Sequence, residues 1–193
     1  MRIVTGSARG RRLHVPPGRA VRPTADRVKE SIFSMLESRY GCEGIAVLDL
    51  FAGSGSLGIE ALSRGAADAV FVEQDARAAE AVRANLRTTG FAGEVLVAPV
   101  TRAIATLHAR GRRFGGVFLD PPYDRGYVAP TLAALADTAL VTDGGWVVVE
   151  HGRDEQPAAA IGTLVRRDTR RFGDTHVSTF TAGAAEEDVD AVP

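Results

Sequence analysis

The chain has few of the residues that support disulfides, metal sites or membrane insertion. Cys42 is its only cysteine, so no intramolecular disulfide can form, and it has no companions at metal-ligand spacing. The basic amino end lacks the apolar stretch of a signal peptide, and no segment has the length needed to cross a bilayer. These absences predict a protein with no metal and no membrane partner, located in a reducing cytoplasm.

A strong overall charge is also lacking, because the net charge is −1. Residues 1–30 nevertheless contain seven arginines and one lysine against two acidic residues, a net charge of +6 that leaves −7 for the remainder. Because phosphate neutralisation is local, a basic arm on an acidic body favours a localised contact with RNA. The arginines expected to meet RNA are Arg2, Arg9, Arg11, Arg12 and Arg22.

The length of 193 residues suits a single main domain with a sizeable core. We expect a basic amino-terminal hairpin extension over residues 1–20, with residues 2–5 pairing with residues 11–15. The main domain would cover residues 21–182, and residues 183–193 would form a disordered acidic tail. We expect the protein to be a monomer.

Strand and helix patterns alternate along the main domain. Apolar periodicity predicts helices at residues 25–39, 76–88, 101–110 and 127–138, and strands at 47–51, 69–73, 94–98, 115–119 and 145–150. Such alternation implies right-handed crossovers and a parallel sheet. Residues 163–171 and 175–181 then flank a turn, which predicts an antiparallel edge to an α/β fold.

A glycine-rich turn links the first strand of the main domain to a helix. Gly53 and Gly55 let the backbone approach a ligand, and Gly58 permits close packing of the helix on the sheet. Asp49 lies among apolar residues, where a buried acid needs hydrogen bonds, so we expect it to brace the turn. Glu73 ends the next strand about 20 residues beyond the first glycine, the spacing at which a carboxylate binds ribose hydroxyls. The pattern predicts a bound adenosine, but alone it suits a dinucleotide dehydrogenase equally well.

A second motif, Asp120-Pro121-Pro122-Tyr123, follows the apolar run Gly116 to Leu119. Alkylating the exocyclic amine of a nucleobase requires acceptors for its N–H groups. The Asp120 carboxylate and the Pro121 carbonyl can supply them, and the double proline restricts the backbone that carries that carbonyl. Tyr123 offers a face on which an extruded base can stack. The same tetrapeptide also suits an ordinary turn, because proline and aspartate favour turns for local reasons.

Together the two motifs resemble those of S-adenosylmethionine-dependent amino-methyltransferases. Both would lie at the carboxyl edge of one sheet, where open α/β sheets bind ligands. The resemblance implies a Rossmann-like class I methyltransferase fold with a mostly parallel seven-stranded sheet. The residues expected to hold the donor are Asp49, Phe51, Ala52, Gly53, Ser54, Gly55, Gly58, Glu73, Thr24 and Arg27.

A narrower resemblance covers residues 2–181. The segment Arg22-Pro-Thr-Ala-Asp-Arg-Val28, the Phe-Ala-Gly-Ser-Gly turn and the Asp-Pro-Pro-Tyr motif, in this order, resemble the RsmD type of bacterial small-subunit rRNA guanine-N2 methyltransferase. This resemblance implies one guanine of 16S rRNA as the substrate, in the small subunit or an assembly intermediate. In such methyltransferases a polar residue at the third strand often lies near adenine. Here residues 98–101 read Ala-Pro-Val-Thr, so backbone or packing contacts are expected instead.

Other readings of these residues remain open. Instead of binding the donor, Thr24 could serve merely as a helix cap, and Arg27 could merely form an ion pair on the surface. His151, at a strand end, could face the cleft or serve the structure. A DNA adenine or protein-glutamine methyltransferase would share the donor and amine sites, and a non-catalytic RNA-binding assembly factor could keep the same fold. Asp120 favours guanine, because guanine presents two adjacent N–H donors to an acceptor-only carboxylate, whereas adenine presents a donor beside an acceptor.

Overall fold

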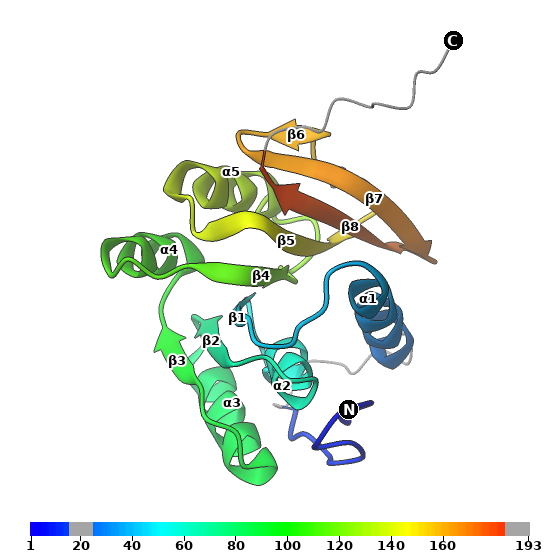
Figure 1. Cartoon of the computed structure of the whole chain (residues 1–193), viewed down its shortest axis with the longest axis vertical. Helices are drawn as coiled ribbons and strands as arrows, with labels where there is room; N and C mark the ends of the chain where they lie inside the picture. The colour runs from blue at the N-terminus through cyan, green and yellow to red at the C-terminus, as the bar shows by residue number, and fades with distance from the viewer. Residues whose placement is uncertain (16–24, 184–193) are drawn as a thin grey trace.

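The computed structural model describes residues 1–15 and 25–183, with the side chains of residues 25 and 26 excluded. Its elements build one eight-stranded sheet in the order β3-β2-β1-β4-β5-β8-β7-β6 (Figure 1). The helices are α1 (Ala25–Arg39), α2 (Ser56–Ser63), α3 (Ala76–Thr89), α4 (Val100–Ala109) and α5 (Val128–Thr138). The strands are β1 (Ala46–Leu50), β2 (Asp68–Glu73), β3 (Glu94–Val97), β4 (Phe114–Leu119), β5 (Val141–Gly152), β6 (Ala160–Ile161), β7 (Leu164–Phe172) and β8 (Thr175–Ala182).

The sheet is parallel from β3 to β5 and antiparallel beyond it. The α/β fold and its antiparallel carboxyl-terminal edge are therefore confirmed. The expected count of seven strands was one too low, because the two-residue strand β6 pairs with the start of β7 at the outer edge. A pairing this short leaves no periodic pattern in the sequence.

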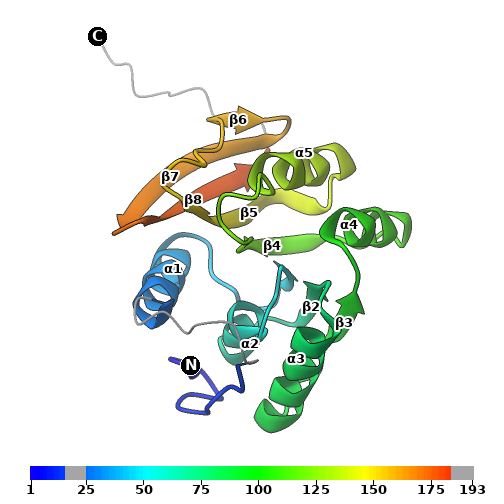
Figure 2. The same cartoon turned by 180° about the vertical axis from the view of Figure 1, so that it is seen from behind.

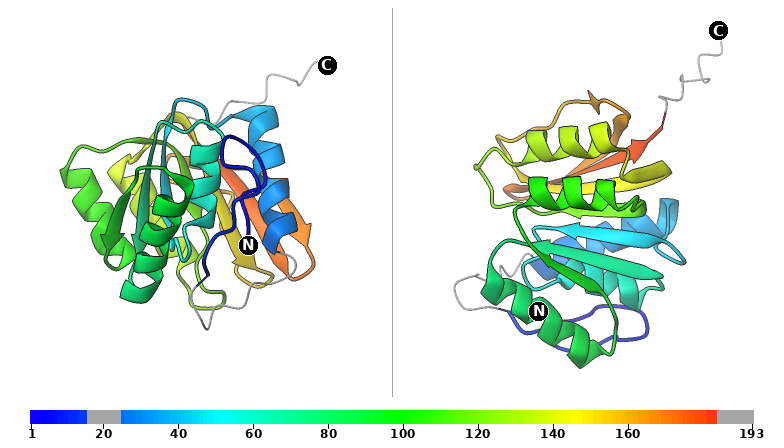
Figure 3. Two further views of the ribbon diagram at one scale, coloured as in Figure 1. Left: turned by 90° about the horizontal axis from the view of Figure 1, so that it is seen from below. Right: turned by 90° about the vertical axis from the view of Figure 1, so that its left-hand side faces the viewer.

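Helices cover both faces of the sheet (Figures 2 and 3). Apolar side chains of α1, α2 and α3 pack on one face, and those of α4 and α5 on the other. The expected packing of α1 is confirmed, since the ring centroids of Phe33 and Phe118 are 5.5 Å apart. Trp146 packs beside Phe118 and fills the space over Gly116, where a Cβ atom would lie 2.2 Å from the indole ring.

The amino-terminal segment forms a shorter antiparallel pairing than the hairpin expected for residues 2–5 and 11–15. The amides of Ile3 and Leu13 donate to the carbonyls of Arg11 at 3.0 Å and Met1 at 3.1 Å, and the amide of Gly10 donates to the carbonyl of Ile3 at 2.9 Å. One isolated antiparallel bridge joins Arg2 to Arg12. The backbone amides of Val4 and Thr5 donate instead to the Glu60 side chain, and that of Ala8 donates to Ser63. Because the amides of Val4 and Thr5 bind Glu60 of α2, the cross-strand pairing does not continue to these two residues, and we call residues 1–15 the arm.

Candidate active site

The glycine-rich turn after β1, residues 51–55, has an unusual backbone. Phe51, Gly53 and Gly55 have φ angles of +60°, +58° and +77°. Glycine adopts such angles freely, but for Phe51 the left-handed conformation costs about 1–3 kcal/mol. Strained residues of this kind cluster at ligand sites, and this one lies at the predicted donor turn.

Two buried carboxylates hold the donor turn in place. The amide of Gly58 donates to Asp49 Oδ2 at 2.9 Å, which confirms the bracing expected of Asp49. Glu73 Oε2 accepts from the amide of Gly53, and its Oε1 accepts from the amide of Asp75, both at 2.9 Å. Asp49 is 1% exposed and Glu73 3% exposed. Glu73 therefore has a bracing role that sequence reasoning missed, and its contact with ribose stays a prediction.

Gly58 allows α2 to lie close to the sheet. A Cβ atom at this position would lie 2.4 Å from Cε1 of Phe71 and 3.2 Å from Oδ2 of Asp49. The close packing expected of this glycine is therefore confirmed. Any side chain here would push α2 away from the strand that carries the donor turn.

Replacing Gly58 with alanine is expected to lower the free energy of unfolding by about 1–3 kcal/mol, because the added methyl overpacks a filled core. It should also weaken binding of S-adenosylmethionine, since α2 and the turn would shift together. Thermal melting and calorimetric titration would measure both effects. Ala105→Ser, at an exposed position of α4, is the control. A Gly58→Ala protein that melts and binds like this control would contradict the packing argument.

The Asp-Pro-Pro-Tyr motif opens a loop after β4, residues 120–127. Pro121 is buried, Asp120 half-buried and Pro122 exposed. Glu155 fixes the loop by accepting from the amides of Asp124 at 3.1 Å and Gly126 at 3.0 Å. No sequence signal identified this glutamate, because the contacts span about 30 residues.

Tyr123 is tethered through its hydroxyl group. The hydroxyl donates to Oε1 of Glu150 at the end of β5 and lies 3.0 Å from Oγ1 of Thr175 at the start of β8. Burial, together with the neighbouring Glu150 carboxylate, raises the pKa of Tyr123, so its hydroxyl stays protonated and able to donate. The ring is thus held at its outer end, as a stacking platform requires. Glu150 was not assigned to the site from the sequence, but its position at the end of a predicted strand, at the same sheet edge, could have identified it.

The structure brings the two loops together. Their strands are parallel neighbours, with Leu50 of β1 in register with Leu119 of β4. Adjacent strands lie about 4.8 Å apart, so the donor turn and Asp120 start from neighbouring positions. The rings of Phe51 and Tyr127 then pack with centroids 5.3 Å apart, one from each loop. This edge can hold a nucleoside beside a planar amine.

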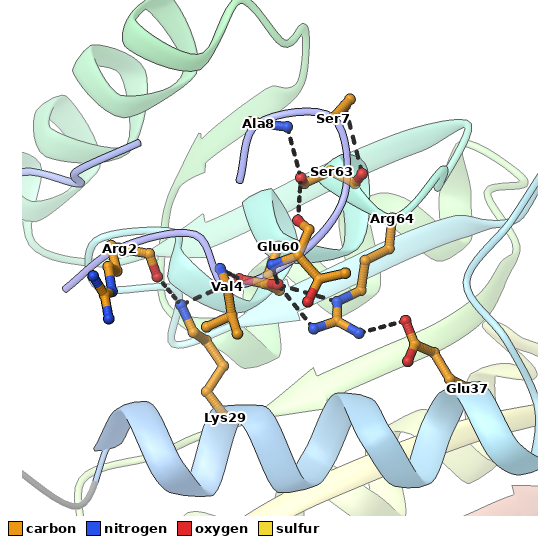
Figure 4. A network of polar contacts seen from close by, with 10 residues as sticks. Arg2, Val4, Ser7, Ala8, Lys29, Glu37, Glu60, Ser63 and Arg64 are labelled. Atoms are coloured by element: carbon orange, nitrogen blue, oxygen red, sulfur yellow. Dashed lines mark hydrogen bonds and ion pairs between the residues drawn. The ribbon is translucent and has the colours of Figure 1, made fainter. Parts of the chain in front are cut away.

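The arm docks on α2 through a buried ionic network (Figure 4). Glu60 is fully buried and lies 3.3 Å from the ammonium of Lys29 and 3.0 Å from the guanidinium of Arg64. The Lys29 ammonium also donates to the carbonyl of Arg2 at 2.6 Å. Because α2 follows the donor turn directly, the network ties the arm to the donor site.

Asn85 of α3 makes a second connection between the arm and the donor turn. Its side-chain amide donates to the carbonyls of His14 at 2.9 Å and Ser54 at 2.8 Å, and its oxygen accepts from the amide of His14 at 2.7 Å. At 1% exposure, it is a buried polar bridge. No local pattern in the sequence predicts this contact.

The remaining predicted residues fall into two groups. Arg2, Arg9, Arg11 and Arg12 are exposed on the arm, and Arg27 is exposed on α1. Arg22 and Thr24 lie outside the described residues, and so do residues 184–193 of the predicted tail.

At the end of β3, the amide of Ala98 donates to the carbonyl of Glu73 at 3.2 Å, which joins this strand end to the donor site.

His151 serves the structure. It is 1% exposed, and its ring nitrogens lie 2.9 Å from the carbonyl of Gly152 and 2.9 Å from Oγ of Ser178. Burial lowers the pKa of His151, so the neutral ring is favoured. Its protein partners occupy both nitrogens, which leaves it no role as a base in the cleft.

Cys42 is buried, and this burial raises the pKa of its thiol to about 11.

Across residues 1–15 and 25–183, His, Cys, Asp and Glu side chains do not gather into a group that could hold a metal ion. None of the helices in that same part of the chain combines the length and apolar character needed to cross a membrane.

Comparisons with known proteins found close relatives. The family described as Conserved hypothetical protein 95 matches residues 1–181. YlbH of Bacillus subtilis is 39% identical over 183 residues, covering 93% of this chain and 98% of that protein. Ribosomal RNA small subunit methyltransferase D of Escherichia coli is 39% identical over 150 residues, covering 78% and 74%. The structure of TTHA0928 from Thermus thermophilus superposes with a TM-score of 0.82 at 33% identity, covering 94% and 99%.

Proposed function

The chain belongs to the family described as Conserved hypothetical protein 95, that of the RsmD-type methyltransferases, and we propose that it methylates N2 of one guanine in 16S rRNA. S-adenosylmethionine is the methyl donor, and the small ribosomal subunit or an assembly intermediate is the substrate. One observation carries the proposal: the braced donor turn and the tethered Asp-Pro-Pro-Tyr loop begin at neighbouring positions of one sheet edge.

The donor site has the chemistry that an adenosyl group needs. The left-handed turn at Gly53 and Gly55 brings backbone rather than side chains to the ligand. Glu73 at the end of β2 would meet the ribose hydroxyls, and Phe51 and Ala52 would contact the rest of the nucleoside. When bound, S-adenosylmethionine supplies a methyl group made electrophilic by the sulfonium.

The protein's own contribution is alignment. Asp120 and the Pro121 carbonyl accept the N–H groups of the amine, which directs its nitrogen toward the methyl group. Tyr123, held by Glu150 and Thr175, supports the face of the flipped base. The amine nitrogen forms the new bond to carbon as the carbon–sulfur bond breaks, and the amine then releases a proton. Positioning of this kind supplies a large share of a displacement barrier.

The carboxylate of Asp120 favours guanine over adenine. It only accepts hydrogen bonds, and guanine offers it two neighbouring donors, the ring N1–H and the amino N–H. Adenine would place its N1 acceptor against the same negative charge. The exposed arm arginines add a site for RNA phosphates, which a protein-glutamine methyltransferase would not need.

The test is to incubate the protein with tritiated S-adenosylmethionine and, separately, unmethylated small subunits, naked 16S rRNA, DNA, a glutamine-containing peptide and guanosine. Digestion and mass spectrometry then locate the label. N2-methylguanosine in small-subunit RNA is the expected product. Label in DNA or peptide would assign the site to a different substrate. Absence of label with intact RNA binding would point to an assembly factor.

Removing the tether of Tyr123 is expected to lower kcat by about 10-fold while leaving donor binding unchanged, because the ring remains but its orientation loosens. Tyr123→Phe removes the hydrogen bonds to both Glu150 and Thr175, and Glu150→Ala removes the first of them, so the double variant should lose little more than Tyr123→Phe alone. Steady-state methylation of small subunits gives the three values of kcat. Losses that multiply in the double variant would show that the two residues act separately.

A further inference from the structure

Strand β7 is rich in arginine, and the proposed function gives this no role. Four of its nine residues are arginines, against one acidic residue, Asp168. Arg167 and Arg171 are exposed, and Arg166 and Arg170 are half-buried. This is a second concentration of positive charge, far from the arm in sequence.

The outer side of β7 is open over most of its length. β6 pairs only with Leu164 and Val165, and the amide of Arg166 donates to the carbonyl of Ala159 at 2.8 Å. Among the residues that the structure describes, no further strand joins this side from residue 167 to residue 172. The arginines therefore border an accessible sheet edge.

Register places this edge close to the catalytic loop. Arg170 is paired with Val177 of β8, and Val177 is paired with Glu150 of β5. Two strand spacings put the β7 backbone roughly 10 Å from the β5 backbone at Glu150. Glu150 binds the hydroxyl of Tyr123, so the β7 backbone at Arg170 and Arg171 lies near the strand position that holds the proposed base site.

The two exposed arginines are anchored in a way that suits phosphate. Arg167 donates through Nε to Oγ1 of Thr181 at 2.7 Å, and Arg171 donates through Nε to the carbonyl of Gly173 at 3.2 Å. A bond at Nε fixes the guanidinium plane and leaves the terminal nitrogens to form a two-pronged contact. Asp168, in contrast, pairs with Arg170 at 3.2 Å and with Arg39 at 3.7 Å.

We propose that Arg167 and Arg171, with Arg170 beside them, bind the phosphate backbone of the substrate RNA next to the flipped base. The β7 edge and the arm lie on opposite sides of the β1–β4 strand pair (Figures 1 and 2). The RNA would thus be held on both sides of the catalytic edge. This inference rests on the proposed function, since it takes RNA as the partner.

The test compares the full-length wild-type chain with the double variant Arg167→Gln/Arg171→Gln. Filter binding to 16S rRNA across a series of KCl concentrations gives the slope of log K against log salt. Losing two phosphate contacts should reduce the magnitude of this slope by about 1–2 and weaken binding by about 10-fold at moderate salt. The kcat at saturating RNA and the Kd for S-adenosylmethionine should stay unchanged.

Arg110→Gln/Arg113→Gln is the matched control. It also removes two positive charges, but beside the amino end of β4, which is the end of the parallel strands opposite to the catalytic loops. The control should keep the wild-type slope. If the β7 variant also keeps it, the inference is overturned. If the variant self-associates while its RNA affinity is unchanged, the arginines only protect an open edge strand. Wild-type protein that binds RNA with the expected slopes but transfers no methyl would instead overturn the proposed function alone.

Discussion

Replacing Asp120 with alanine is expected to lower kcat for RNA methylation by about 10²–10³-fold or more. The substitution removes the charged acceptor that we propose orients the amine, while the donor turn is braced separately by Asp49 and Glu73. The Kd for S-adenosylmethionine should therefore stay within about twofold of wild type. Single-turnover methylation and calorimetric titration measure the two quantities independently.

Two further substitutions sharpen this test. Asp120→Asn keeps the shape but places a donor beside an acceptor, a pattern that suits adenine better than guanine, so guanine methylation should fall nearly as far. Asp124→Asn removes a neighbouring exposed carboxylate at φ +56°, an angle that asparagine tolerates, and should retain activity. Methylation of guanine at the wild-type rate by Asp120→Ala would end the assignment of Asp120 to the reaction.

The two loops were predictable because each depends on a short run of residues. Gly53 and Gly55 lie in one strand-to-helix turn and Gly58 in the first turn of the helix that follows. Asp120 to Tyr123 belong to one loop, so local spacing was enough to identify both motifs. A parallel sheet then brings strand ends to a common edge whatever the details of packing. This is why the juxtaposition of the two loops could be inferred without coordinates.

The groups that hold these loops could not be inferred in the same way. Glu155 meets the catalytic loop from 29 to 31 residues away, and Glu60 meets the arm from about 55 residues away. A charged residue at such a position has the same local pattern as a solvated one. Only the fold reveals which backbone amides donate to it and, for Glu60, that the side chain is buried. The pairing within the arm is shorter than expected for the same reason, because the amides of Val4 and Thr5 donate to Glu60 of α2.

Replacing Glu60 with alanine is expected to lower the free energy of unfolding by about 3–5 kcal/mol. Glu60 is fully buried, and its loss would leave the amides of Val4 and Thr5 without their acceptor and would remove the carboxylate that pairs with the buried ammonium of Lys29. Urea unfolding followed by circular dichroism measures the change. Donor affinity should fall as well, because the arm and α2 would loosen beside the donor turn.

Glu80→Ala is the matched control for this substitution. Like Glu60, Glu80 pairs with two basic side chains, Arg83 at 3.5 Å and Arg87 at 3.0 Å, but the side chain of Glu80 is 59% exposed. Exposed pairs of this kind contribute about 0–1 kcal/mol, so the control should stay close to wild-type stability. Equal losses from both variants would contradict the view that Glu60 anchors the arm. A large loss confined to Glu60→Ala would instead mean that deleting the arm damages the fold, so that arm arginines must be tested for RNA binding by single substitutions such as Arg9→Gln.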